Sequence, residues 1–155
     1  MLSFDLEVSY SQICVFHTNL QSPFNDWTDE HVKQGFSWRP GSVCFRMLEE
    51  FGSAKVLVEL KEQVNLRSDT IRAFQLPFVV PQDGLIEVAS VADSKQLKLN
   101  PGSYSLAFET GLDEDGGMWC FLSFLMSPSV EARILRADAE LNPRPHLLMT
   151  AEPAL

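Results

Sequence analysis

The residue types that perform nucleophilic or metal catalysis occur in this chain without the spacing that such chemistry needs. It contains no Gly-x-Ser-x-Gly sequence and no glycine-rich phosphate loop. His17, His31 and His146 lack metal-ligand spacing, and we expect His31 to be a solvated helix residue. Glu49 and Glu50 are adjacent in a predicted turn, where water would surround both carboxylates equally, which does not suit acid–base catalysis. The sequence therefore predicts no enzyme, no bound metal and no cofactor.

A second group of carboxylates is Asp113, Glu114 and Asp115, which precede Gly116-Gly117. The segment lacks the alternating Asp-x-Asp-x-Asp-Gly order and the distal Glu of an EF-hand, although loop carboxylates of a β-sandwich also bind calcium. Three interpretations stay open: a solvated hairpin loop, a calcium site, or an acidic protrusion that meets a basic partner.

Aromatic side chains crowd one segment that also carries Asp26, Asp29 and Glu30. The aromatic residues of this segment are Phe24, Trp27, Phe36 and Trp38. One interpretation is that the rings pin an irregular excursion onto a sheet. The other is a contact surface, because aromatic anchors surrounded by charges are typical of interface hot spots. For the second interpretation we select Asp26, Trp27, Asp29, Glu30 and Phe36, together with the acidic loop 113–115, as partner-binding candidates.

The cysteines, Cys14, Cys44 and Cys120, are odd in number and far apart in the sequence. Each lies in an apolar stretch, and no paired spacing indicates a disulfide framework or a zinc site. We therefore expect three buried, unpaired thiols in a reducing cytoplasm.

Length and charge limit the classes of function. The chain has 155 residues, which fits one domain. Its formal net charge of -9 repels the phosphates of nucleic acids and attracts basic partners. The acidity is concentrated in the outer thirds, with net charges of -4 over residues 1–50, zero over 51–108 and -5 over 109–155. No apolar run reaches the ~18 residues that span a bilayer, and no secretory signal is visible at the N-terminus.

Period-two alternation of apolar and polar residues predicts an all-β fold, an antiparallel β-sandwich, with a closed barrel as the next choice. Thr28 is a good N-cap, and a short helix is predicted near residues 28–35. Pro77 marks its strand as an edge or bulged strand, and the turn Asn100–Ser103 predicts a hairpin between 96–99 and 104–108. We expect one sandwich domain over residues 1–142 and a loosely attached tail over 143–155, since Asn142-Pro143-Arg144-Pro145 continues neither strand nor helix.

Several motifs resemble the competence protein J family (ComJ, or Nin), which inhibits a DNA-entry nuclease. The first is Asp26-Trp27-Thr28-Asp29-Glu30 followed by Gln34-Gly35-Phe36. Three further segments follow in the same order: Leu76-Pro77-Phe78-Val79-Val80, Ile86-Glu87-Val88-Ala89-Ser90, and Leu97-Lys98-Leu99-Asn100-Pro101-Gly102-Ser103-Tyr104-Ser105-Leu106. The resemblance spans roughly residues 9–110 and does not extend past Gly111.

The resemblance implies an acidic inhibitor that binds a NucA-like DNA nuclease through its basic active-site groove. Such a pair accompanies DNA uptake in competent bacteria, or acts as toxin and immunity protein. The alternative that the residues leave open is a non-catalytic β-sandwich module that binds calcium, a small ligand or a membrane surface, with residues 111–117 as its site.

Overall fold

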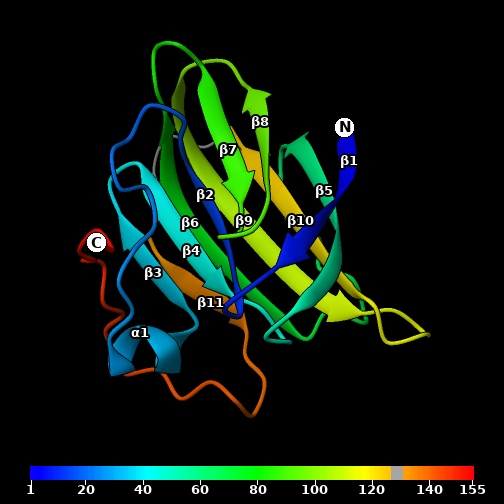
Figure 1. Ribbon diagram of the computed structural model, residues 1–155. Coiled ribbons are helices and arrows are strands. Elements are labelled where there is room, and N and C mark those ends of the chain that lie inside the picture. Colours follow the sequence, from blue (N-terminus) through cyan, green and yellow to red (C-terminus); the bar gives the residue numbers. More distant parts are fainter. Residues whose placement is uncertain (127–130) are drawn as a thin grey trace.

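The computed structural model describes residues 1–126 and 131–155, which form two β-sheets packed face to face (Figure 1). The larger sheet has this strand order: β1 (Leu2–Val8), β5 (Gly52–Lys61), β10 (Met118–Leu125), β9 (Gly102–Leu112), β6 (Arg72–Val80), β11 (Arg133–Arg136). The smaller sheet has this order: β3 (Phe36–Arg39), β4 (Ser42–Arg46), β2 (Gln12–His17), β7 (Leu85–Ala89), β8 (Ser94–Lys98). Only β5 and β10 pair in parallel among these strands. The predicted all-β class with one short helix is confirmed.

Alternation places one face of each sheet in a shared core. In β1, Leu6 and Val8 are buried, whereas Asp5 and Glu7 are exposed. Stacked phenylalanine rings join the two sheets, and the ring centroids of Phe45 on β4 and Phe108 on β9 lie 4.3 Å apart. Buried aromatic rings contribute large apolar areas, so this contact adds to the cohesion between the sheets.

The position of Pro77 agrees with its chemistry. β6 lies between β9 and β11, but β11 pairs only with residues 73–75 of β6. The part of β6 that contains Pro77 therefore has a partner strand on one side, where a missing backbone N–H is tolerated.

The hairpin predicted at Asn100–Ser103 is wrong. β8 pairs with β7 in the smaller sheet, whereas β9 pairs with β10 and β6 in the larger one. The turn thus carries the chain from one sheet to the other, and the Tyr104 hydroxyl closes it by donating to the Asn100 carbonyl at 2.8 Å. Turn residues determine that the chain reverses, but they do not determine which strands pair.

The short helix α1 (Asp29–Gln34) has the predicted caps. The Thr28 hydroxyl accepts the His31 amide, the His31 ring accepts the Thr28 amide, and Gly35 ends the helix with φ of 92°. His31 is 2% exposed, so the expectation of a solvated histidine is wrong. Its second ring nitrogen lies 2.9 Å from the Thr150 carbonyl oxygen. No helix of the described residues is both long and apolar enough to span a membrane.

The C-terminal segment, residues 137–155, runs along α1 and the loop before it (Figure 1). Leu148 exchanges two hydrogen bonds with the buried side chain of Gln34, and the Ala154 amide donates to the Phe24 carbonyl at 2.8 Å. Only Leu141 of this segment reaches the main core as a buried residue. Prolines exclude regular structure in this segment without excluding hydrogen bonds to neighbouring segments.

A buried ion pair connects this segment to the core. Arg72 on β6 is fully buried, and its guanidinium donates to both carboxylate oxygens of Asp138 at 2.8 Å. Burial alone raises the pKa of Asp138, but the hydrogen bonds and charge of Arg72 outweigh this effect and hold the pKa below its ordinary value. Arg72 also donates to the Arg46 carbonyl at 3.0 Å, so the pair links three segments.

Candidate interaction surface

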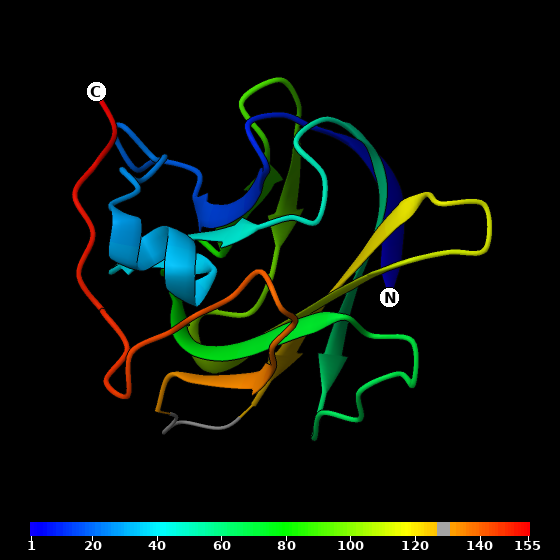
Figure 2. The ribbon, with the colours of Figure 1, turned by 90° about the horizontal axis from the view of Figure 1, so that it is seen from below.

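The strand registers bring several loops to one end of the sandwich (Figure 2). Val8 pairs with Gly52, Ala54 with Met118, and Met118 with Leu112. We call this end of the molecule the acidic end. It consists of α1, residues 7–11 at the end of β1 and in the following turn, the loop 47–51 and the hairpin loop 113–117.

Exposed carboxylates from both acidic thirds of the sequence lie at the acidic end. The exposed members are Glu7, Asp29, Glu49, Glu50, Glu114 and Asp115. In Figure 2, α1 and the loop 113–117 lie on opposite sides of this end, with the loop 47–51 between them. The fold therefore brings the two candidate groups to one end of the molecule, but not into one cluster.

The first candidate group surrounds the start of α1. Asp26 and Asp29 expose their side chains, and the backbone amide of Asp26 donates to the Glu152 carbonyl at 2.8 Å. Glu30 forms an ion pair with Arg144 at 2.9 Å, so part of its charge is neutralised by the C-terminal segment.

The aromatic candidates of this group face inward. Trp27 is half-buried, and its indole N–H donates to the Gln12 side chain at 2.9 Å. Phe36 is fully buried and packs against Phe74, with ring centroids 5.5 Å apart. Phe36 is therefore a core residue, and its selection as a contact residue does not agree with its position. In the sequence it appeared beside a helix, and nothing there showed that it begins the buried strand β3.

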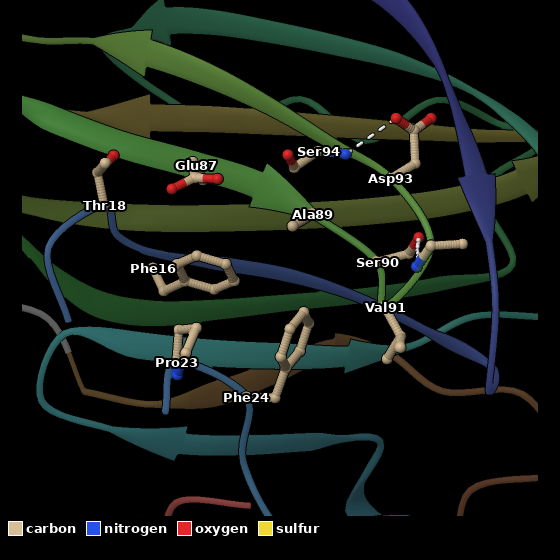
Figure 3. A pocket seen from close by; sticks show the side chains of 11 residues that line it. Phe16, Thr18, Pro23, Phe24, Glu87, Ala89, Ser90, Val91, Asp93 and Ser94 are labelled. Atoms are coloured by element: carbon tan, nitrogen blue, oxygen red, sulfur yellow. Dashed lines mark hydrogen bonds between the residues drawn. The ribbon is translucent and has the colours of Figure 1, made fainter. Parts of the chain in front are cut away.

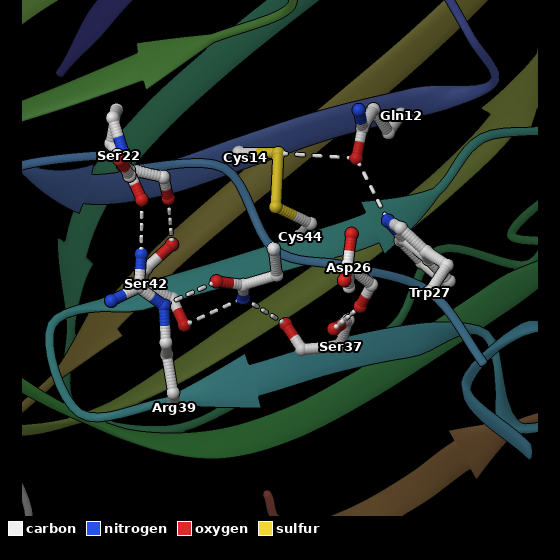
Figure 4. The surroundings of a disulfide bond; sticks show 11 residues. Gln12, Cys14, Ser22, Asp26, Trp27, Ser37, Arg39, Ser42 and Cys44 are labelled. Carbon is white, nitrogen blue, oxygen red and sulfur yellow. Dashed lines mark hydrogen bonds between the residues drawn. A yellow bond between two sulfur atoms is a disulfide. The ribbon is translucent and has the colours of Figure 1, made fainter. Parts of the chain in front are cut away.

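The expectation of three unpaired cysteines is also wrong. Cys14 and Cys44 lie directly opposite each other on β2 and β4 and form a disulfide (Figure 4). It lies on the outer face of the smaller sheet, where Phe24 and Trp27 pack over it. The two cysteines are 30 positions apart in sequence, and only the register of β2 against β4 brings them together. Cys120 is buried, and burial raises the pKa of its thiol.

The second candidate group forms the tip of the β9–β10 hairpin. The Asp113 carboxylate accepts the Gly117 amide at 2.7 Å and so stabilises the turn. The pKa of Asp115 lies below its ordinary value, chiefly because of its hydrogen bond with the Asp113 side chain and then because of the Gly117 amide. Glu114 and Asp115 are exposed. Among the described residues, no three His, Cys, Asp or Glu side chains are placed to hold a metal ion together.

Sequence reasoning missed an exposed aromatic pair at the acidic end. Tyr10 is 68% exposed and Phe51 is 60% exposed, and their ring centroids lie 6.2 Å apart. Tyr10 lies on the turn between β1 and β2, and Phe51 directly precedes β5. The sequence offered a signal only for Phe51, which follows two glutamates in a predicted turn.

A hollow on the outer face of the smaller sheet is one candidate for a small-molecule site (Figure 3). Phe16, Phe24 and the carboxylates of Glu87 and Asp93 line it. The two oxygens of Asp93 accept the backbone amides of Ser94 and Glu7, at 2.9 and 3.1 Å. Because Asp93 already holds a turn and β1 in place, the hollow gives little support to a ligand-binding function.

A comparison with known protein families assigns the chain to one of them. The model of the family described as competence protein J (ComJ) matches residues 5–125. These residues include most of β1 and every other strand of both sheets in full, with the exception of β11. This protein belongs to the competence protein J family. The C-terminal segment that covers α1 lies outside the matched residues.

Two relatives agree with this assignment. The DNA-entry nuclease inhibitor of Bacillus subtilis (strain 168) is 26% identical over 106 residues, which are 66% of this chain and 76% of the relative. The crystal structure of ComJ from Bacillus subtilis, described as an inhibitor of the DNA degrading activity of NucA, superposes with a TM-score of 0.71. That comparison has 22% sequence identity and covers 81% of this chain and 95% of the ComJ chain, and it supports the fold.

Proposed function

We propose that this protein is a non-catalytic inhibitor that binds a NucA-like DNA nuclease and blocks DNA hydrolysis. The observation that carries the proposal is the family match over residues 5–125, in a family with a curated relative named as a DNA-entry nuclease inhibitor. The inhibitor acts by occupying the nuclease and performs no reaction of its own.

The charge of the molecule supports this role. A nuclease presents cations to a phosphate backbone, so its active-site groove is basic and its field attracts polyanions. The inhibitor carries a net charge of -9 and presents exposed carboxylates from several loops at the acidic end. The same charge disfavours direct binding to nucleic acid. Electrostatic attraction of this kind mainly raises the association rate.

The candidate groups receive different roles in this proposal. Asp26 and Asp29 beside α1, and Glu114 and Asp115 on the hairpin tip, meet basic side chains of the nuclease. Glu30 and Asp113 contribute less, because Arg144 and the Gly117 amide already bind them. Trp27 lies half-buried beneath this surface, where its indole N–H donates to the side chain of Gln12.

A nuclease-inhibition assay tests the function directly. Supercoiled plasmid is incubated with the source organism's own NucA-like nuclease and increasing amounts of this protein, and nicking is measured. We expect nicking to fall as the ratio of inhibitor to nuclease rises, as stoichiometric binding requires. Undiminished nicking at molar excess contradicts the proposal.

A matched pair of charge variants tests the acidic end. Glu114→Gln and Glu62→Gln each remove one exposed carboxylate, at the acidic end and just after β5 at the opposite end. We expect Glu114→Gln to slow association with the nuclease more than Glu62→Gln does. Equal effects would mean that only the total charge matters.

The disulfide bears on where the protein acts. The cytoplasmic location expected from the sequence rested on unpaired thiols and on the lack of a visible secretory signal, whereas disulfides persist in oxidising compartments. Alkylation of the protein in intact cells, followed by mass spectrometry, determines whether Cys14 and Cys44 are paired there. The choice between DNA uptake and immunity depends on whether the inhibited nuclease belongs to the cell's own uptake machinery.

A further inference from the structure

We infer that the exposed pair Tyr10 and Phe51 is the apolar centre of the nuclease-binding surface. The inference rests on the proposed function and assigns a contact site to it. Tight interfaces need a desolvated apolar centre inside a charged rim, because steering by charge adds little to the final affinity. Trp27 and Phe36 do not supply this centre, since the first is half-buried and the second fully buried.

The backbone beneath Tyr10 has an unfavourable conformation for its residues. Tyr10 and Ser11 have φ of 54° and 58°, the positive values that both central residues of a type I′ turn require. Asn-Gly is the usual sequence for this turn, because glycine and asparagine adopt positive φ with little steric cost. A bulky tyrosine in this position costs stability, and its largely exposed ring recovers little of that cost through burial.

The two aromatic residues are held together by the backbone. The Ser11 amide donates to the Glu50 carbonyl at 3.0 Å, and the Met47 amide donates to the Ser11 carbonyl at 2.7 Å. The turn 9–11 and the loop 47–51 therefore form one unit, and the ring centroids lie 6.2 Å apart within aromatic contact distance. A pair fixed in this way loses little conformational freedom on binding, which favours affinity.

The charges around the pair determine which partner it fits. Residues 1–11 and 47–54 contain four carboxylates and no Lys, Arg or His. Glu7, Glu49 and Glu50 of this set are exposed beside the pair. A second copy of this chain would place these glutamates against each other. A basic protein surface complements both the carboxylates and the aromatic faces, because Arg and Lys bind carboxylates and also stack on aromatic rings.

The test uses a substitution that removes the aromatic side chain and improves the turn. Tyr10→Asn with Ser11→Gly restores the preferred type I′ sequence, so the melting temperature should equal or exceed that of the wild type. We expect this variant to weaken binding to the NucA-like nuclease by about tenfold or more, as loss of a hot-spot aromatic does. Phe51→Ser is expected to weaken binding similarly.

A matched control removes apolar surface elsewhere. Val79→Ser alters a side chain that is 54% exposed near the far end of β6, and it should leave affinity and inhibition unchanged. Affinity is measured by calorimetry, inhibition by plasmid nicking, and association state by sedimentation velocity.

The outcomes separate the inference from the function. If the wild type does not inhibit, the proposed function fails. If it inhibits and the Tyr10→Asn/Ser11→Gly variant inhibits equally well, the function stands and this inference fails. The inference also fails if the wild type dimerises and the variant is monomeric with unchanged inhibition, because the pair then serves self-association. The inference is also contradicted if inhibition weakens only together with a lowered melting temperature in both the Tyr10→Asn/Ser11→Gly variant and Phe51→Ser.

Discussion

Removal of one partner of the ion pair between Arg72 and Asp138 should destabilise the fold strongly, because the guanidinium of Arg72 is fully buried. Asp138→Asn keeps the shape of the side chain but leaves a fully buried guanidinium without its bidentate partner. Removal of one member of a buried pair costs about 3–5 kcal/mol. Arg72 would keep its bond to the Arg46 carbonyl at 3.0 Å and a weaker contact with Glu140 at 3.7 Å, so we expect a loss of about 3 kcal/mol, at the low end of that range.

The chain contains a matched control for this prediction. Arg67 and Asp69 form a bidentate pair with both distances at 2.9 Å, but both side chains are about half exposed. Exposed pairs contribute about 0.2–1 kcal/mol, so Asp69→Asn should have a small effect. Thermal unfolding followed by circular dichroism should show a fall in Tm of roughly 6–12 °C for Asp138→Asn, from about 2–4 °C per kcal/mol at this chain length. Equal, small shifts for the two variants would refute the reasoning from burial.

The same pair predicts a dependence of stability on pH. The pKa of Asp138 in the folded protein is lower than in the unfolded chain, so the pair contributes fully above the ordinary Asp pKa of about 3.9. Its contribution is lost as the pH falls below that value towards the folded-state pKa. The difference in free energy of unfolding between wild type and Asp138→Asn should therefore be constant from neutral pH down to about 5 and shrink at lower pH. A difference that grows on acidification would contradict the assignment.

Three other outcomes are expected. Reduction of the Cys14–Cys44 disulfide, which spans 30 positions, should lower stability by about 3–4 kcal/mol, and Tm measured with and without reductant should show it only in the protein that retains both cysteines. Gly35→Ala should destabilise the protein strongly in urea unfolding, because the added Cβ would lie 2.5 Å from the Phe74 ring at a φ of 92°. Association with the nuclease should slow as salt rises, and stopped-flow rates independent of salt would exclude steering by charge.

Local signals in the sequence predicted most of the elements. Alternation identified the strands because one face of each strand is buried in a shared core, and Thr28 and Gly35 identified the ends of α1 because capping depends on neighbouring residues. These are short-range effects, so a single sequence contains them.

The errors concern contacts between residues far apart in the chain. The cross-strand position of Cys14 and Cys44, the separation of β8 from β9 and the burial of Phe36 follow from which strands pair and in what register. The path of the C-terminal segment follows from hydrogen bonds to Gln34 and Phe24, residues more than a hundred positions away. No local pattern specifies such partners.

The candidate site shows the same difference between features that local sequence determines and features that the tertiary fold determines. The sequence identified the acidic loops, because charge is visible in composition, and the fold brings them to one end. It did not show that Phe36 is buried and Trp27 half-buried, because exposure depends on the tertiary fold. Tyr10 became visible only through its positive φ and its exposed ring beside Phe51.

The C-terminal segment also changes the distribution of charge at the acidic end. Arg144 of this segment neutralises Glu30, which leaves fewer unpaired carboxylates on the α1 side. On the other side, Glu7, Glu49, Glu50, Glu114 and Asp115 are exposed along the adjacent strands β1, β5 and β10 and their loops. Exposed carboxylates therefore gather on the side that also presents Tyr10 and Phe51. Charge and apolar surface coincide there, and this coincidence favours that side over α1 as the place where a basic nuclease would bind.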